Sequence, residues 1–501
     1  MIRVTRSLCS TTLTLLALAA VPAAQAAVLT VTKTADTLDG ACNLDCSLRE
    51  AVVAANANPG TDVVILPSGT YLLTRFGEGE DLAATGDLDI TDDLVILGAG
   101  VPTTVIDAVE LDRILHVHNT SLTLSGALFQ RGRIAGNGGA LLNEDGDVEL
   151  TRVQFTSNGT TGDTFGGAIF TDGSTGSLTV IESTFNLNLA GASGGAIAAR
   201  GTELTLRNAT FLANRANTAF GGALYLFRDL PATINNVTIT GNTAAQAGGG
   251  VYSENSAFIG SNAPTFSNTI IAGNTGGNAP DCTGSTQSTG YNLVSVGGGC
   301  TGFSAAKNDI QGTAATPLIQ VTGPSGSFGG PTPTVSLLPA SPAVNAGNPA
   351  APGSGPGACE PVDQRGAARP AGTRCDIGAF EVTTACVPGE VTLCLNNGRF
   401  KVTAAFRATA NDNLQPARAV TLTEDTGYLY FFDRKNVEAT IKVLNGCGVN
   451  SRYWVFASGL TNVQVVLTVT DTRTGTVKEY TNPLNRPFRP IQDTVAFNTC
   501  P

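Results

Sequence analysis

Residues 194–223 read GGAIAARGTELTLRNATFLANRANTAFGGA, which is one complete repeat followed by the start of the next. The Gly-Gly-Ala mark, Gly-Gly-Gly in its last copy, recurs at successive spacings of 28, 28, 27 and 27 residues. A second mark, Phe-x-x-Asn or Ile-x-x-Asn, follows each glycine pair. A fixed period of this length is typical of a solenoid, in which each repeat buries its apolar side against its neighbours.

The repeated glycines and asparagines have predicted structural roles. We expect the glycine pairs at tight corners, where two backbones approach closely, and the asparagines in ladders of hydrogen bonds from one turn to the next. Stacking alone accounts for these residues, so we assign none of them a catalytic role. They are Gly138, Gly139, Gly166, Gly167, Gly194, Gly195, Gly221, Gly222, Gly248, Gly249, Asn158, Asn188, Asn214, Asn242 and Asn274.

The nine residues that end at each repeated Phe or Ile align without gaps. They are SLTLSGALF, DVELTRVQF, SLTVIESTF, ELTLRNATF, PATINNVTI and APTFSNTII. Positions two and four are mostly apolar, as in a strand with one buried face, and the next apolar positions are seven and nine. The strand must therefore bend. Position six holds Gly or Asn in four copies but Arg152 and Glu182 in the others, so we expect two strands per repeat and a corner that is not uniform.

The two marks, across residues 121–274, resemble the polymorphic outer-membrane protein repeat of bacterial surface proteins. This resemblance implies an all-β chain with a right-handed parallel β-helix of the pectin lyase-like type. Some members of that family are adhesins. We place the solenoid at residues 61–345.

The N-terminus has the pattern of a secretory signal peptide, residues 1–26. Arg3 and Arg6 precede the apolar run 13–21, and the small residues of Ala24-Gln25-Ala26 form the expected cleavage site. The run is too short to cross a bilayer, and no later stretch approaches twenty apolar residues, so we expect no transmembrane segment in the mature chain. We therefore predict a secreted, extracellular or surface-located bacterial protein.

Ten cysteines remain after this segment is removed, and an even number in an exported chain favours disulfides. Sequence neighbours suggest the pairs Cys42–Cys46, Cys282–Cys300, Cys359–Cys375, Cys386–Cys394 and Cys447–Cys500, although spacing leaves the connectivity open. A zinc site is disfavoured, because the chain has no paired Cys-x-x-Cys units and only two histidines, His116 and His118. We predict no metal site.

Residues 27–60 are expected to form a first strand and a capping helix. Ser47 can act as the N-cap with Glu50 three residues on, and Leu48, Ala51, Val52 and Ala55 share one helical face. The helix would cover the first turn of the solenoid. The stretch from Cys46 to Asn56 resembles the CSLREA domain found at the start of many secreted bacterial β-helix proteins.

Three stretches further on, 337–347, 363–366 and 375–381, resemble the choice-of-anchor Q domain, which implies a cap that closes the solenoid at residues 346–385. Asp363, Arg365, Asp376 and Glu381 in this cap could be a catalytic cluster. A charge network that holds an irregular cap together is the alternative that we favour.

Residues 386–501 hold the one tryptophan and several β runs, and predict a small β-sandwich with a hairpin turn at 471–476. Tyr428, Tyr430 and Trp454 are candidates for stacking against sugars, although aromatic residues in such strands are more often core.

The formal net charge of −11 disfavours nucleic acid as a partner. The best position for a binding site is the loop from Arg75 to Gly86, which interrupts the repeat, together with the acidic residues near it and the histidine pair. The two histidines are two residues apart on a strand, so we expect them on one face, as a structural pair or as ligands. The candidate binding residues there are Asp87, Asp89, Asp92, Asp93 and Asp112.

Parallel β-helices include polysaccharide lyases and glycoside hydrolases, but the fold alone does not decide function. A lyase would need carboxylates for Ca²⁺ with a Lys or Arg base, and a hydrolase would need paired carboxylates; the regular repeats offer few such groups. We predict no cofactor and leave only Ca²⁺ open. The sequence favours a non-catalytic protein that binds polysaccharide or another cell-surface component, with a pectate-lyase-like lyase or glycoside hydrolase as the alternative.

Overall fold

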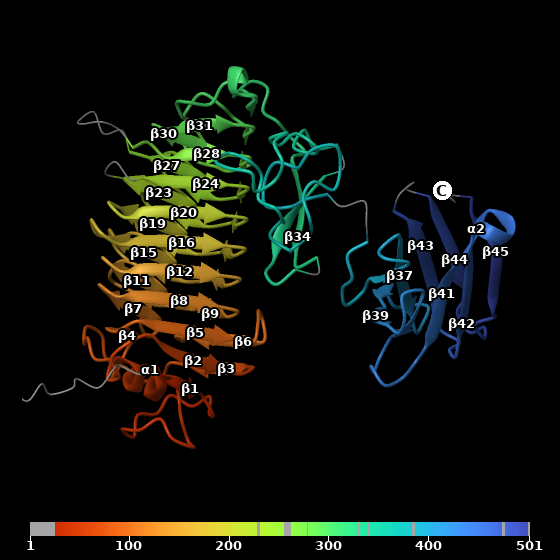
Figure 1. Ribbon diagram of the computed structural model, residues 1–501, viewed down its shortest axis with the longest axis horizontal. Helices are drawn as coiled ribbons and strands as arrows, with labels where there is room; N and C mark the ends of the chain where they lie inside the picture. The colour runs from red at the N-terminus through yellow and green to blue at the C-terminus, as the bar shows by residue number, and fades with distance from the viewer. Residues whose placement is uncertain are drawn as a thin grey trace, which may run out of the picture.

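The computed structural model describes residues 26–227, 231–254, 262–277, 279–328, 330–338, 340–382, 386–472 and 476–498. The predicted signal peptide, except Ala26, lies outside these residues. The chain from β1 to β33 is a right-handed parallel β-helix, as predicted, and its strands stack in parallel sheets along one axis (Figure 1). Among the described residues, no helix is both long and apolar enough to cross a membrane.

Each regular turn of the solenoid contains four strands, not the two that the sequence predicted. From one glycine pair to the next, the chain forms one strand in each of the sheets that we name C, A, B and D, in that order. The additional strands are the one directly after the glycine pair and a two-residue strand directly after the repeated Asn. They were missed because the alignment covered only the nine residues that end at Phe or Ile.

Sheets A and B form two long walls. Sheet A contains β1 (Val28–Thr30), β2 (Asp62–Leu66), β5 (Leu94–Gly98), β8 (Ser121–Ser125), β12 (Asp147–Thr151), β16 (Ser177–Ile181), β20 (Glu203–Arg207), β24 (Ala232–Asn235), β28 (Thr265–Ser267) and β31 (Gln287–Gly290). Sheet B contains β3 (Gly69–Leu72), β6 (Thr104–Asp107), β9 (Leu128–Gln130), β13 (Gln154–Thr156), β17 (Thr184–Asn186), β21 (Thr210–Leu212), β25 (Thr238–Thr240), β29 (Ile270–Ala272), β32 (Leu293–Val294) and β33 (Ile310–Gln311).

Sheets C and D complete the circuit. Sheet C contains β4 (Leu88–Ile90), β7 (Leu115–His118), β11 (Leu141–Glu144), β15 (Ile169–Asp172), β19 (Ile197–Arg200), β23 (Leu224–Phe227), β27 (Val251–Ser253) and β30 (Cys282–Gly284). Sheet D contains β10 (Arg133–Ile134), β14 (Gly159–Thr160), β18 (Leu189–Ala190), β22 (Arg215–Ala216) and β26 (Thr243–Ala244). A short 3-10 helix, η1 (Ala305–Lys307), precedes β33.

The bend between sheets A and B has the same backbone conformation in all six aligned copies, which corrects the expectation of a non-uniform corner. Position six has φ from +47° to +68° in every copy, including +55° at Arg152 and +51° at Glu182. Both residues adopt the left-handed conformation despite their side chains, and their ion pair, 2.6 Å between Arg152 Nε and Glu182 Oε2, links the two corners. Positions seven and nine then point inward, as predicted.

The two glycines of each pair are needed for different reasons. The first has φ between +62° and +71° in all five pairs. The second has no such angle, but a Cβ atom added at Gly195 would lie 2.1 Å from the carbonyl oxygen of Gly222 in the next turn. The predicted tight corner with close backbone approach is therefore confirmed.

Aromatic and amide ladders fill the interior. Phe129, Phe155, Phe185 and Phe211 stack at successive centroid distances of 4.9, 5.1 and 5.0 Å. The predicted asparagine ladder runs beside them: from Asn158 to Asn242, each side-chain amide donates to Oδ1 of the Asn in the next turn at 2.9–3.1 Å. Asn274 donates instead to Oδ1 of Asp281, where the ladder ends.

The predicted capping helix is α1 (Leu48–Asn56), which lies at one end of the solenoid (Figure 1). The capping box between Ser47 and Glu50 is present, and the predicted apolar face is buried. Arg49, predicted for no role, is also buried. Its guanidinium forms an ion pair with Asp36 (2.7 Å) and donates to the carbonyl oxygens of residues 83, 86 and 87.

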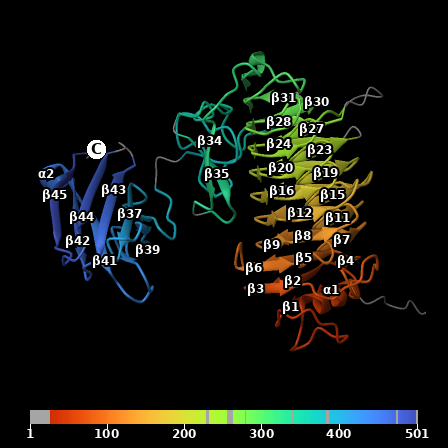
Figure 2. The same cartoon turned by 180° about the vertical axis from the view of Figure 1, so that it is seen from behind.

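Residues 312–382, which we call the flank, follow the last parallel strand. They contain the antiparallel pair β34 (Thr322–Gly326) and β35 (Thr334–Leu337). The flank lies along the side of the solenoid in both views (Figures 1 and 2). It contacts the corner between sheets A and B: Nε2 of Gln364 donates to Oγ1 of Thr184 (2.9 Å), and Nδ2 of Asn236 donates to the carbonyl oxygen of Gly378 (3.2 Å).

The C-terminal region consists of two antiparallel sheets that enclose one separate hydrophobic core. The first contains β36 (Leu393–Leu395), β37 (Phe400–Arg407), β38 (Gln415–Pro416), β43 (Gln464–Asp471) and β44 (Val477–Asn482). The second contains β39 (Arg418–Thr421), β40 (Thr426–Tyr430), β41 (Ala439–Gly446), β42 (Arg452–Gly459) and β45 (Ile491–Phe497), with α2 (Cys447–Asn450) between β41 and β42. The predicted hairpin is confirmed by the pairing of β43 with β44.

Four of the five suggested disulfides are present: Cys42–Cys46, Cys282–Cys300, Cys359–Cys375 and Cys386–Cys394. Cys447 is also disulfide-bonded. Its suggested partner, Cys500, lies outside the described residues.

Candidate functional sites

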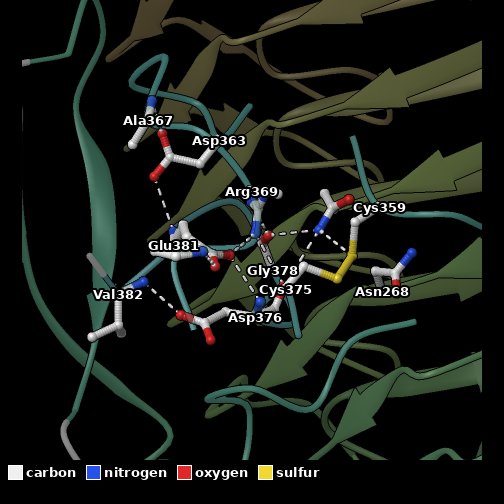
Figure 3. Close-up of polar contacts among 12 residues, drawn as sticks. Asn268, Cys359, Asp363, Ala367, Arg369, Cys375, Asp376, Gly378, Glu381 and Val382 are labelled. Atoms are coloured by element: carbon white, nitrogen blue, oxygen red, sulfur yellow. Dashed lines mark hydrogen bonds and ion pairs between the residues drawn. A yellow bond between two sulfur atoms is a disulfide. The ribbon is translucent and has the colours of Figure 1, made fainter. Parts of the chain in front are cut away.

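Four charged residues of the flank form one buried network (Figure 3): Asp363, Arg369, Asp376 and Glu381. Arg369 Nη1 lies 2.8 Å from Oε2 of Glu381, and Arg365 Nη2 lies 2.6 Å from Oδ2 of Asp363. Both pairs are almost fully buried, and the guanidinium of Arg365 stacks 3.6 Å from the ring centroid of Phe380. The four predicted residues are thus brought together under the surface of the flank. Asp363 pairs with Arg365, Glu381 pairs with Arg369, which the sequence analysis did not name, and Asp376 accepts from backbone N–H groups.

Backbone amides satisfy the carboxylates of this network. Glu381 accepts from the N–H groups of residues 371 and 376, and Asp363 from those of 365, 367 and 381. Burial raises the pKa of Asp376 to about 6, and the nearby Glu381 acts in the same direction, against the N–H groups of Asn345 and Val382 and the charge of Arg369. These contacts support the structural alternative for the cluster.

Asp87, Asp89 and Asp112 are close together beneath the loop from Arg75 to Gly86. Desolvation raises the pKa of Asp87 to about 7 although Arg113 lies 3.3 Å away, and it also raises the pKa of Asp112. Burial alone would raise the pKa of Asp89. Hydrogen bonds from His116, His118 and the N–H of residue 83 stabilise its carboxylate more strongly, so the pKa is lowered. The sequence therefore identified a group of interacting titratable side chains.

Asp92 and Asp93 lie apart from this group, in the turn between β4 and β5. Oδ2 of Asp92 accepts from the N–H of Gly60 (3.0 Å). Oδ1 of Asp93 accepts from the N–H of Ser121 and the hydroxyl of Thr120, both at 3.0 Å, and these bonds lower its pKa. Both carboxylates connect neighbouring turns of the chain, which is a structural role.

Tyr428, Tyr430 and Trp454 are half-buried on strands whose intervening residues, Leu429 and Val455, are in the core. Their side chains therefore share the outer face of the second C-terminal sheet. They do not form one platform, because Tyr428 pairs with Thr440 and Trp454 with Leu444, which puts them about 13 Å apart along β41.

A set of aromatic side chains that the sequence analysis missed lies on the outer face of sheet C. We call it the aromatic strip; it consists of Phe165, Phe170, Phe220, Tyr225, Phe227 and Tyr252. Tyr225 is central, with ring centroids 4.8 Å from Phe227, 5.6 Å from Tyr252 and 5.9 Å from Phe165. Phe170 lies on β15, Tyr225 and Phe227 on β23 and Tyr252 on β27, whereas β19 between them contributes no ring. Phe165 and Phe220 come from the segments directly before a glycine pair.

One charged pair lies within the strip. The guanidinium of Arg200 on β19 is 5.5 Å from the ring centroid of Phe170 and 5.8 Å from that of Phe227, and it forms an ion pair with Asp172. Desolvation raises the pKa of Tyr225 to about 12, with Glu254 and Tyr252 acting in the same direction. Stacked rings beside a fixed charge pair can bind flat, partly polar molecules such as sugars.

A sequence signal for the strip exists. The fourth residue after the first glycine of each pair is Leu142, Phe170, Ala198, Tyr225 or Tyr252, and this column faces outward. Only an alignment of the segment after the glycines would reveal it. The small residue at 198 breaks the aromatic pattern in that column.

Residues 236–254 match the family model described as the Chlamydia polymorphic membrane protein repeat. The matched residues include the mark Ile239-x-x-Asn242 and the glycines 248–250, so the match covers one copy of the repeat. In the other two comparisons the chain matches no curated protein and no solved structure.

Proposed function

We propose that this chain is an exported surface or extracellular bacterial protein that binds polysaccharide along the outer face of sheet C. The aromatic strip is the observation that carries the proposal. Phe170 is buried, but the partly exposed rings of Tyr225, Phe227 and Tyr252 come from neighbouring turns of the solenoid, so they can contact successive units of an extended ligand. The Arg200–Asp172 pair supplies polar groups at its centre.

The disulfides and the repeat type support export. Disulfides persist in oxidising compartments, and the matched repeat family is described as a membrane protein repeat. With residues 1–26 as a signal peptide, we infer a CSLREA-type cap at 46–56 and a choice-of-anchor Q-type module within the flank. Both modules are consistent with an adhesive protein at the cell surface.

We propose binding without catalysis. Polysaccharide cleavage requires carboxylates that are available to a metal ion or to the scissile bond. In the described parts of the strip and the flank, the main Asp and Glu candidates are engaged by arginines: Asp172 by Arg200, Asp363 by Arg365 and Glu381 by Arg369. Incubation with uronate polymers and Ca²⁺ tests the alternative, because a lyase would release unsaturated products.

The binding proposal is tested with the full mature chain on an array of bacterial and plant polysaccharides. We expect Tyr225→Ala and Tyr252→Ala each to weaken binding to the best ligand by roughly 10-fold or more, because an aromatic contact contributes about 1 kcal/mol beyond its buried area. Tyr428→Ala and Trp454→Ala are matched controls from the C-terminal region. Binding that is lost in the controls and kept in the strip variants would refute the proposed location.

A further inference from the structure

His116 and His118 point to the same side of β7. Leu115 precedes the first histidine and Val117 separates the two, and both are fully buried in the solenoid core. The two imidazoles therefore lie on the opposite, outer face of sheet C. Their ring centroids are only 3.7 Å apart. Asp89 on β4 is the direct pairing partner of His116, which puts its carboxylate beside both rings.

Four potential ligand atoms converge here. One atom from each of Asp81, Asp89, His116 and His118 lies within 4.8 Å of every other. Oδ1 of Asp89 is 3.6 Å from Nδ1 of His116 and 3.1 Å from Nε2 of His118. In a tetrahedral site with metal–ligand distances of 2.0–2.1 Å, neighbouring ligand atoms are about 3.3 Å apart, so this spacing fits a common metal ion.

A carboxylate from the next turn orients one of the rings. Oε2 of Glu144 on β11 lies 3.2 Å from Nε2 of His116, which leaves Nδ1 facing Asp89. A carboxylate that binds the outer nitrogen of a histidine is the usual second partner of a metal-bound imidazole, because it fixes the tautomer and the ring. The second oxygen of Asp89 is held as well, by the N–H of Ala83 at 2.8 Å.

The loop that carries Asp81 is fixed above the cluster. Glu80 accepts from the N–H groups of residues 82 and 85, and Arg75 donates to the carbonyl oxygen of Ala84. Arg49 of the capping helix binds three carbonyl oxygens of the loop and the residue after it. Because the cap, the loop and two turns of the solenoid all position these side chains, the site is preorganised.

We propose that Asp81, Asp89, His116 and His118 bind a divalent transition-metal ion of the Zn²⁺ class. Two imidazole nitrogens and two carboxylate oxygens suit Zn²⁺, whereas Ca²⁺ takes six or more oxygen ligands. The two carboxylates balance the charge of the ion, and Asp89 is fully buried. Four protein ligands indicate a structural ion that pins the loop onto the first turns of the solenoid.

The chain itself allows a direct test, since His116 and His118 are its only histidines. Mature protein carrying no histidine tag is dialysed against Zn²⁺ and analysed for bound metal, and Co²⁺ is added to a second sample for its visible absorption. We expect one Zn²⁺ per chain, a Co²⁺ spectrum of four-coordinate type, and an unfolding temperature that falls when the ion is chelated. An excess of Ca²⁺ should not displace Zn²⁺.

Four variants separate the roles of the residues. His118→Ala and Asp81→Asn should each weaken Zn²⁺ binding by more than about 100-fold, and Glu144→Ala by roughly 10- to 100-fold, as expected for a positioning residue. Asp81 is exposed in a loop, so its variant keeps the packing of the solenoid. Glu149→Ala, an exposed change in the same turn as Glu144, should leave binding unchanged. The proposal is overturned if the native chain binds no stoichiometric Zn²⁺. It is also overturned if His118→Ala and Asp81→Asn bind Zn²⁺ as tightly as the native chain does.

Discussion

The second corner of each turn, between sheets B and D, places a residue in the left-handed region. This residue lies two positions after the repeated Phe or Ile, and its φ is positive in all six aligned copies: +53° at Arg131, +56° at Ser157, +59° at Leu187, +55° at Ala213, +68° at Gly241 and +70° at Gly273. In two copies this residue is glycine, which adopts the left-handed conformation without a steric clash. The other four keep a side chain at a conformational cost of about 1–2 kcal/mol each.

Leu187→Gly should therefore stabilise the solenoid. Leu187 is 57% exposed, so little packing is lost, and relief of the left-handed strain outweighs the extra flexibility of glycine in the unfolded chain by about 0.5–1 kcal/mol. Urea unfolding followed by circular dichroism measures the change. Thr156→Gly is the control, in a strand with no positive φ, and should destabilise. A lower midpoint for Leu187→Gly would contradict the strain argument.

At the residue scale, sequence reasoning succeeded where a position recurs. Phe185 and Asn188 were assigned correctly because each copy of the repeat gives the same information. Asp89 follows the loop 75–86, which interrupts its turn, and its pairing with His116 of the next turn depends on a strand register that no motif marks. Asp93 was selected for its charge, but its contacts are those of a turn.

At the scale of the elements, the flank differs from the solenoid because it is irregular and contains buried ion pairs. Its resemblance to a capping domain predicted closure of the solenoid, whereas the structure lays it along the corner between sheets A and B. The contacts join residues more than 100 positions apart, such as Asn236 with Gly378. Without a repeat in the flank, the sequence offers no register from which to predict them.

The flank should make stability depend on pH through Asp376. Its pKa is about 6 in the folded chain, above the value of about 3.9 expected when unfolded, so the folded state binds the proton more tightly. This contribution to stability is complete below about pH 4 and is lost as the pH rises to about 6. Asp376→Asn cannot titrate.

The prediction is measured as the difference in unfolding free energy between the native chain and Asp376→Asn, from pH 4 to 8. We expect the native chain to lose stability relative to the variant between pH 4 and 6 and the difference to be constant above that. Parallel profiles across the whole range would show that Asp376 titrates normally. Glu381 and Arg369, which face Asp376, are unchanged in both proteins.

In the whole molecule, the solenoid and the C-terminal sheets have separate hydrophobic cores. Leu206 belongs to the first and Leu467 to the second, and both are fully or almost fully buried. The period of the repeat predicted the first core, and the runs of alternating residues predicted the second. The order of strands in the C-terminal sheets could not be predicted, because antiparallel pairs there join segments that are distant in the sequence, such as β42 and β45.

Separate cores predict separate unfolding events. Calorimetry of the full chain should show more than one transition, since each core can melt without exposing the other. Leu206→Ala and Leu467→Ala remove similar buried volumes and should each cost about 2–5 kcal/mol, in different transitions. If both variants shifted one and the same transition, the two regions would form a single cooperative unit.

The flank also has a consequence for the length of the molecule. It contacts the turns that contain Thr184, Thr210, Asn236 and Asn268. These contacts fix the number of turns in this part of the solenoid. If a turn within that span were duplicated or deleted, the flank could no longer form all of these hydrogen bonds at once. Among the described residues, no hydrogen bond joins the flank to the turns between Ser121 and Thr156, so there the solenoid could grow or shrink in increments of about 4.8 Å without breaking the contacts of the flank.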